Sequence, residues 1–239
     1  MQYKIVKENP DYMLVWKPSN LATTPIKSNP ECLITYLVGD YPFLKNVEGY
    51  GKPGEYGLLN RLDNKTSGLI IVAKTDEAFV NIREKFDSMQ KVYLAVCYNL
   101  GTEQEGIIDI PIAHHKTDPK RMVWVTETGE NQKFQYRGKI QHCETEFSVI
   151  SQEEAKKIWT GYLPKEIPFP GSLVGSKEKD NFIWIKCAIT KGKRHQIRIH
   201  LKYMKYPVFG DDIYSTKDKK HSKIDYYALF GVGFEGLPD

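Results

Sequence analysis

The run LLNRLDNKTSGLIIVAKT, residues 58–75, joins a polar segment to a strongly apolar one. Leu69 to Ala73 form a continuous apolar run with the length and β-branching of a buried strand. After it, Thr75 can cap a helix whose first turn holds Asp76 and Glu77, because acids favour a helix N-terminus. The buried face of this helix is expected to consist of Phe79, Ile82, Phe86 and Met89. The run therefore predicts a loop, a buried strand and a helix in succession.

Further strands are expected on both sides of this unit. The N-terminal segment IVKENPDYMLVWKP holds two apolar stretches around an Asn-Pro-Asp turn, and Ser28, Asn29 and Pro30 are expected to open a helix. Later strands are expected at residues 92–98, 122–125, 146–150 and 182–189, with a last helix from about His195 to Met204. Because strands and helices do not alternate regularly, the order predicts an α+β fold with a mixed, largely antiparallel central sheet flanked by helices and loops.

The domain organisation is expected to be simple. No internal repeat, low-complexity tract or boundary is evident, so residues 1–239 are expected to form a single domain. A chain of 239 residues can bury a sizeable core without disulfides or metals. Residues 161–180, GYLPKEIPFPGSLVGSKEKD, contain three prolines and are expected to form an inserted surface loop.

Composition narrows the class of protein. The chain is 41% hydrophobic and 27% charged, and no window approaches the roughly 20 apolar residues of a membrane helix. The N-terminus lacks the pattern of a signal peptide. The four cysteines lie far apart without a CxxC pair, which argues against a zinc ribbon and against a secreted disulfide scaffold. We therefore expect a cytoplasmic protein with reduced thiols and no membrane partner.

No motif indicates a cofactor. His114 with His115, and His195 with His200, lack the spacing and the supporting ligands of a metal site. Residues 231–236, GVGFEG, fit the GxGxxG pattern, but no helix is expected after them to receive a pyrophosphate. We expect neither a metal nor a nucleotide cofactor.

The distribution of charge is more informative than its total. A net charge of +4 and a pI near 8.6 only weakly suggest a nucleic-acid partner. Residues 191–205, however, hold six cations and no acid, and residues 217–223 are rich in lysine. Taken alone, such a run is more typical of a solvated helix face.

Asp63 is the acid that local chemistry singles out. It stands in the loop before the predicted strand, among Arg61, Lys65 and two hydroxyls, and Gly68 permits a close backbone approach. Cationic neighbours would keep the carboxylate ionised, as a nucleophile requires. By local chemistry alone, however, Asp-Asn-Lys-Thr-Ser-Gly is also typical of a simple turn.

A family resemblance changes this balance. GLLNRLDNKTSGLIIVAKT resembles the RLD-x-x-T-S-G-L-L signature of the RluA-type pseudouridine synthases, which implies that Asp63 is the catalytic nucleophile. Downstream, Lys91-Val92-Tyr93 resembles the family's Lys-x-Tyr element, which implies that Tyr93 stacks against the target base. Without the neighbouring motif, a core tyrosine on a strand would be the simpler interpretation.

A third stretch strengthens the resemblance. KGKRHQIRIHLKYMKYPVFGDDIY, residues 191–214, is similar to the family's G-R-T-H-Q-I-R-x-H-L followed by Pro-x-x-Gly-Asp and a tyrosine. The resemblance implies that Arg198 pairs with the catalytic carboxylate, a role that suits the planar fork of a guanidinium. On the predicted helix, Arg194, Arg198 and Lys202 would share one cationic face.

The resemblance also implies a substrate and a set of contacts. The implied function is isomerisation of specific uridines in ribosomal or transfer RNA to pseudouridine, with RNA as the partner and no cofactor. Because no room for an N-terminal S4 domain is expected before Tyr3, RNA binding is expected from the catalytic domain itself, acting as a monomer. The implied substrate and RNA contacts are Arg61, Thr66, Ser67, Gly68, Lys91, Lys193, Arg194, His195, Gln196, His200 and Lys202.

Three positions depart from the family pattern. Asn60 stands where the family usually has histidine, Lys193-Arg194 where it has Arg-Thr, and Phe230-Gly231 where it has His-Ala. Asn60 and Phe230 favour the main alternative, a non-catalytic RNA-binding protein that retains the fold. A glycosidase using Asp63 and a second acid is a more distant alternative, because no paired carboxylate motif accompanies Asp63.

Overall fold

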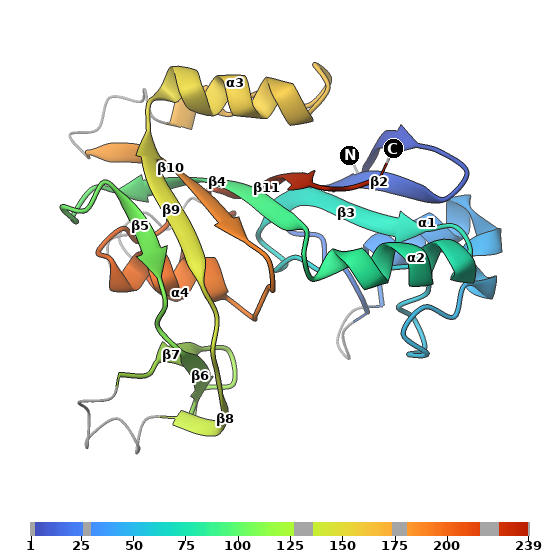
Figure 1. The fold of residues 1–239 in the computed structure, drawn as a ribbon, viewed down its shortest axis with the longest axis horizontal. Helices are drawn as coiled ribbons and strands as arrows, with labels where there is room; N and C mark the ends of the chain where they lie inside the picture. The colour runs from blue at the N-terminus through green and yellow to red at the C-terminus, as the bar shows by residue number, and fades with distance from the viewer. Residues whose placement is uncertain (1–2, 26–29, 127–135, 174–180, 216–224, 239) are drawn as a thin grey trace.

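A mixed sheet of eight strands dominates the computed structural model, which describes residues 3–25, 30–126, 136–173, 181–215 and 225–238 (Figure 1). In spatial order its strands are β1 (Lys4–Glu8), β2 (Tyr12–Lys17), β3 (Ser67–Ala73), β11 (Leu229–Glu235), β4 (Gln90–Tyr98), β10 (Phe182–Ile189), β9 (Thr145–Ile150) and β5 (Glu105–Ile108). Every neighbouring pair is antiparallel except β3 and β11, which run parallel. The prediction of an α+β fold with a mixed, largely antiparallel sheet is confirmed.

Helices cover both faces of this sheet. The helices are α1 (Leu33–Asp40), α2 (Asp76–Phe86), α3 (Gln152–Tyr162) and α4 (Gln196–Tyr203), with 3-10 turns η1 (Pro42–Asn46) and η3 (Gly171–Leu173). The alternation of side chains along a strand separates the two sides. Ile71 of β3 packs in one core cluster with α2 and α3, whereas Ile70 packs against α1 on the opposite face. Along β4, Leu94 belongs to the cluster of α3, and Ala95 to that of α4.

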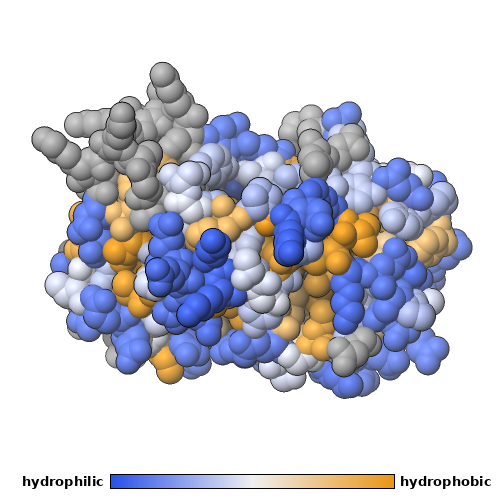
Figure 2. Space-filling model, turned by 90° about the horizontal axis from the view of Figure 1, so that it is seen from above, coloured by the Kyte–Doolittle hydropathy of each residue, from blue (hydrophilic) through white to orange (hydrophobic). Residues whose placement is uncertain are grey.

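A second, three-stranded sheet lies at one end of the molecule, below the main sheet in Figure 1. Its strands, in spatial order, are β7 (Met122–Trp124), β6 (Ile112–His115) and β8 (Tyr136–Gln141). It is joined to α4 by a small core cluster that includes Ile112, Met122 and Ile199. Seen from above, the face of the molecule that carries α3 is largely hydrophilic, with hydrophobic residues visible between the polar ones (Figure 2).

The unit predicted from residues 58–75 is confirmed. β3 is followed by α2, and the Thr75 side chain accepts a hydrogen bond of 3.1 Å from the backbone N–H of Ala78. The expected apolar face of α2, together with Met89 just beyond the helix, is buried. Its packing against β3 fixes the strand that follows the Asp63 loop.

The other predicted elements differ mainly at their ends. α1 begins at Leu33, after a Cys32 whose backbone N–H donates to the side chain of Thr35, and not at residues 28–30. Of those three, Ser28 and Asn29 lie outside the described residues. The strands expected at 92–98, 122–125, 146–150 and 182–189 are found as β4, β7, β9 and β10, and the last helix as α4.

The expected surface loop at 161–180 is corrected in its first half. Residues 161 and 162 end α3, and Leu163 and Ile167 are buried. The indole N–H of Trp159 donates to the carbonyl of Ile167 at 2.9 Å, and the Phe169 ring stacks on Trp184 at 5.1 Å. Apolar side chains therefore hold residues 163–169 against the sheet, while residues 174–180 lie outside the described part of the chain.

All four cysteines are buried and free. None of the described helices has the length and apolar content needed to span a membrane.

Candidate active site

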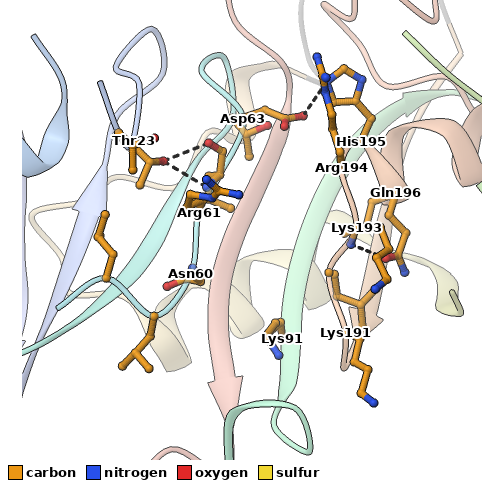
Figure 3. Close-up of a pocket in the computed structure, with 18 of the residues that line it drawn as sticks. Thr23, Asn60, Arg61, Asp63, Lys91, Lys191, Lys193, Arg194, His195 and Gln196 are labelled. Carbon is orange, nitrogen blue, oxygen red and sulfur yellow. Dashed lines mark hydrogen bonds and ion pairs between the residues drawn. The ribbon is translucent and has the colours of Figure 1, made fainter. Parts of the chain in front are cut away.

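A pocket of about 720 Å³ opens near β3 and β11, the parallel strand pair of the main sheet (Figure 3). β11 pairs with β3 over only two residues, Phe230 with Ser67 and Gly231 with Gly68. The pocket is lined by the loop before β3, the start of β4, and the segment that joins β10 to α4. The junction of the parallel pair therefore brings together the three stretches that the sequence singled out.

Asp63 lies in the loop before β3, with 27% of its side chain exposed. Its backbone carbonyl accepts from the N–H of Thr66 at 3.1 Å, which closes a turn. Next to it, the Leu62 backbone exchanges two hydrogen bonds with the Thr23 hydroxyl, at 3.2 and 3.0 Å. The turn predicted by local chemistry is real, and it presents the Asp63 carboxylate to the pocket.

Asn60, one of the departures from the family pattern, anchors the same loop. Its side-chain carbonyl accepts from the N–H of Ile71 at 2.9 Å, and its amide donates to the carbonyl of Leu69 at 3.1 Å. These two bonds continue the hydrogen bonding of β3 into the loop. Asn60 therefore has a clear structural role beside Asp63.

Arg198 of α4 joins two carboxylates. Its Nη1 donates to Oδ2 of Asp63 at 2.7 Å, while its Nε and Nη2 form a bidentate pair with Asp211 at 2.7 and 2.9 Å. The side chain of Arg198 is 2% exposed and that of Asp211 is 0% exposed. Burial alone would lower the pKa of Arg198, but hydrogen bonds and charge from Asp211, with the charge of Asp63, raise it above its ordinary value. The guanidinium is thus a fixed cation.

One oxygen of the Asp63 carboxylate is left open. Arg198 takes Oδ2, and Oδ1 has no hydrogen-bond partner among the described residues. A carboxylate held at one oxygen and open at the other can act as a nucleophile toward a group bound in the pocket.

Tyr93 of β4 lines the same pocket. Burial, and then the negative charge of Asp63, raise the pKa of its hydroxyl above the usual value, so the phenol is neutral at physiological pH. A Cβ atom on Gly231 would lie 3.2 Å from the Tyr93 ring. Gly231, where the family usually has alanine, therefore gives this ring space.

Two buried groups that sequence reasoning missed support Arg198 and the loop. The ring of Tyr227 lies 4.1 Å from the Arg198 guanidinium, and its hydroxyl donates to Asp212 at 2.9 Å. The fully buried ammonium of Lys17 donates to the backbone carbonyls of Pro18, Leu21 and Asn64. Burial lowers the pKa of Lys17 to about 7, against the charge of Asp63, which raises it.

Several side chains expected to contact RNA are instead buried in the scaffold. The Gln196 amide donates to the carbonyl of Glu144 at 2.8 Å, and His200 contacts Thr145 and the carbonyl of Ile110 at 2.8 and 2.9 Å. Both side chains are at most 2% exposed. They join α4 to β9 and to the segment that leads into the small sheet, so we reassign them from RNA contacts to structural positions.

Lys91, Thr66 and Gly68 are buried as well. The Lys91 ammonium donates to the carbonyls of Phe86, Met89 and Thr190, and burial lowers its pKa to about 8. A Cβ on Gly68 would lie 2.6 Å from the backbone of Gly231, so glycine is needed where β3 pairs with β11. Thr66 and Lys91 line the pocket, and Gly68 allows β3 and β11 to approach each other beside it.

The remaining residues that were expected to contact RNA differ in their exposure to solvent. Arg61, Lys193 and Arg194 are exposed at the pocket edge, as is Lys191. We call these four cations the rim. Ser67 begins β3 and is half-buried, and the half-buried Lys202 is not among the residues that line the pocket. The expected cationic face of α4 is wrong at its centre, because Arg198 points into the protein and is paired on two sides.

His195 lies next to Asp63 in the pocket (Figure 3). Its Nε2 is 3.9 Å from Oδ2 of Asp63, and its Nδ1 lies 2.8 Å from the hydroxyl of Tyr214. Burial lowers the pKa of His195 to about 4, so the ring is neutral at physiological pH.

The third departure, at Phe230, lies away from the pocket. Its ring packs edge-on against Trp159 of α3 at 5.4 Å, in the core on the opposite side of β11. Among the described residues, no group of three or more histidine, cysteine, aspartate or glutamate side chains is placed to hold a metal ion.

The protein has an α+β fold, and an acid, an arginine and a tyrosine lie together at one pocket. Cations edge this pocket, an arrangement that suits an enzyme acting on a nucleic acid. Comparison with known proteins gives the family. A family model described as RNA pseudouridylate synthase matches residues 11–203, and the chain belongs to this family.

Individual relatives agree with this assignment. The chain is 26% identical over 220 residues to the uncharacterized RNA pseudouridine synthase YlyB of Bacillus subtilis, covering 91% of this chain and 59% of that protein. It is 26% identical over 221 residues to the dual-specificity RNA pseudouridine synthase RluA of Yersinia pestis, covering 90% and 84%. The chain thus spans about three fifths of the length of YlyB.

Solved structures support the fold. Human RNA pseudouridylate synthase domain containing 1 matches with a TM-score of 0.64 at 18% identity, over 99% of this chain and 83% of that one.

Proposed function

We propose that this protein is an RNA pseudouridine synthase that isomerises uridine by way of Asp63. The observation that carries the proposal is the carboxylate itself, which Arg198 fixes through Oδ2 while Oδ1 stays open beside Tyr93 in the pocket. Membership of the RNA pseudouridylate synthase family supports it.

The proposed reaction begins when a uridine leaves the RNA stack and enters the pocket, which requires a few kcal/mol of unstacking free energy. The neutral ring of Tyr93 is placed to contact the base, and Asp63 promotes cleavage of the bond between C1′ and N1. The detached uracil turns within the pocket, and a bond forms between C1′ and C5. N1 gains a proton and C5 loses one, so the atoms balance without a redox partner. Confinement matters because recapture of a held base can be worth roughly 7 to 11 kcal/mol.

The proposed substrate is ribosomal or transfer RNA. Among the relatives, one from Nitrosomonas europaea that is 26% identical is a ribosomal large subunit pseudouridine synthase D. The rim cations would contact phosphates, since each is exposed at the mouth of the pocket. RNA binding should therefore weaken steeply as salt is added.

The alternative is an RNA-binding protein without catalytic turnover, which the differences from the family pattern at Asn60 and Phe230 favour. Asn60 now has a role in holding the loop of Asp63, and Phe230 one in the core behind β11. Both substitutions are compatible with an intact site, which favours the catalytic proposal.

Release of tritium separates the two proposals. RNA labelled with tritium at uridine C5 should lose its label to water on incubation with the wild-type protein, because C5 exchanges its hydrogen for C1′. The Asp63→Asn variant keeps the size of the side chain and should still bind the RNA, but it should release no label. Binding without release by the wild type would favour the non-catalytic alternative, and equal release by both proteins would refute the role of Asp63.

A further inference from the structure

His195 adopts an unusual backbone conformation at the edge of the pocket. Its φ of 56° lies in the left-handed region, which is unfavourable for a residue with a Cβ. It precedes the first residue of α4, yet its side chain makes no capping hydrogen bond to that helix. The strained backbone instead directs the ring into the pocket, where it is 8% exposed.

A buried tyrosine fixes one nitrogen of this ring. Tyr214 packs edge-on against His195, with centroids 5.6 Å apart and planes at 82°, and its hydroxyl lies 2.8 Å from Nδ1. The same hydroxyl oxygen accepts from the backbone N–H of Met122 at 2.8 Å. The hydroxyl has one proton of its own, and Nδ1 is the acceptor recorded within reach of it among the described residues. This arrangement favours Nδ1 as the acceptor of the tyrosine proton, with the ring proton on Nε2.

The other nitrogen has no hydrogen-bond partner among the residues that the structure describes. Nε2 is 3.9 Å from Oδ2 of Asp63, which is too long for a hydrogen bond. That oxygen already accepts from Arg198 at 2.7 Å. His195 lines the pocket that holds the open oxygen of Asp63, so its Nε2–H is available to a group bound there.

The charges around His195 keep the ring neutral. Burial is the largest cause of its lowered pKa, and the positive charges of Arg198 and Arg194 act in the same direction. Asp63 and Asp211 oppose them but do not reverse the shift. A neutral ring can offer its Nε2 proton to a substrate without forming an ion pair that would occupy Asp63.

We propose that His195 is a further catalytic residue, whose Nε2–H donates a hydrogen bond to a carbonyl oxygen of the target uracil, with Tyr214 as the positioning residue that fixes its tautomer. This role rests on the proposed function. When the bond between C1′ and N1 breaks, its electron pair stays on the uracil ring and spreads onto the carbonyl oxygens. A fixed donor beside Asp63 stabilises that developing charge.

The tautomer can be observed without any substrate. In protein labelled with ¹⁵N at histidine, long-range proton–nitrogen spectra at pH 7 should show His195 neutral with its proton on Nε2. The Tyr214→Phe variant keeps the ring but removes the hydroxyl, so a larger share of the ring should carry its proton on Nδ1. A charged ring, or a wild-type ring protonated on Nδ1, would overturn the proposal.

Two variants of His195 test its action on the substrate. His195→Gln retains an N–H donor near the position of Nε2, whereas His195→Met has a similar length and no donor. Both are unbranched at Cβ and share the left-handed strain, so each controls for the other. Under single-turnover conditions we expect His195→Met to release tritium about 100-fold more slowly with little change in RNA affinity, and His195→Gln to lose about tenfold or less.

The outcomes separate this role from the function on which it rests. Normal release by the wild type and by His195→Met would overturn the role of His195 alone. Absence of release from the wild type would overturn the proposed function, and this role with it. If His195→Met does not fold, the Tyr214→Phe variant carries the kinetic test, and an unchanged release rate in that variant would overturn the positioning role.

Discussion

The cations of residues 191–205 fall into two groups that the sequence does not distinguish. Arg198 is buried, bonded to two carboxylates and stacked on Tyr227, whereas Lys193 and Arg194, a few residues earlier, are exposed at the rim. The difference shows that one basic motif serves two purposes. Its helical part holds the Asp63 carboxylate, and its loop part is exposed at the edge of the pocket. Substitutions in the scaffold and on the rim should separate these two purposes.

Substitution of Gly68 should give the largest effect on stability, because this residue pairs with Gly231 where β3 and β11 lie closest. In Gly68→Ala, the new Cβ would meet the backbone of Gly231 at 2.6 Å, so the sheet must shift or separate. We expect a loss of about 3 kcal/mol or more in the free energy of unfolding, measured by urea denaturation. Gly161→Ala in α3 is the matched control, since nothing lies within 4 Å of its new Cβ, and it should stabilise by about 0.5 to 1 kcal/mol. Equal effects of the two variants on stability would contradict the close approach of the Gly68 and Gly231 backbones.

Arg198→Lys tests the buried side of the division. A lysine keeps the charge but cannot bond Asp211 with two nitrogens and Asp63 with a third, so a buried carboxylate loses part of its pairing. We expect a loss of about 3 kcal/mol in stability and about 100-fold in turnover, by denaturation and tritium release. Arg194→Lys on the rim should change neither quantity, and a similar loss there would remove the distinction between the two groups.

Lys17 should make stability depend on pH. Its pKa is about 7 in the folded protein and near 10.5 when unfolded, so between these values the unfolded chain holds the extra proton. Stability should therefore rise with pH from about 7 toward 10, by on the order of 1 kcal/mol per pH unit relative to Lys17→Met. Unfolding free energies at pH 7, 8 and 9 measure this difference. The exposed Lys45→Met is the control, and a pH-independent difference between wild type and Lys17→Met would argue against the lowered pKa of Lys17 in the folded protein.

Removing rim charge should have the smallest effect on the fold. Lys191→Gln combined with Lys193→Gln should leave stability within about 0.5 kcal/mol and the rate of the bound complex unchanged. RNA affinity should fall, and the slope of log affinity against log salt should decrease by about 1 for each lysine that contacts a phosphate. Lys156→Gln, on α3 across the sheet, should leave the slope unaltered. A double variant that turns over slowly but binds normally would place these lysines in the scaffold.

The fold was predictable where the signal is local. β3 and α2 were found because an apolar run, a capping threonine and a helical repeat follow one another in a few residues. β11 was missed because its sequence, LFGVGFE, is rich in glycine, a residue depleted in strands, and its formation depends on β3 and β4 on either side. α3 was not predicted, although Ser151 caps it and two acids lie in its first turn. The segment after it differs from the expected loop because Ile167 bonds to Trp159 and Phe169 stacks on the distant Trp184.

The site was predictable to a similar extent. The motifs led to Asp63, Tyr93 and Arg198, and the structure places the first and last 2.7 Å apart beside the pocket that Tyr93 lines. Asp211 and Tyr214 were seen in the sequence only as parts of a pattern. Their partners were not evident, because bonds to Arg198 and His195 depend on how residues 207–215 fold back over α4.

Mapping pseudouridine in cells that lack this protein is the most direct test of the central claim that Asp63 carries uridine isomerisation. The deletion should abolish modification at one or more uridines of ribosomal or transfer RNA. Wild-type protein supplied to these cells should restore it, and Asp63→Asn protein at equal abundance should not. Restoration of the same positions by Asp63→Asn would contradict the account.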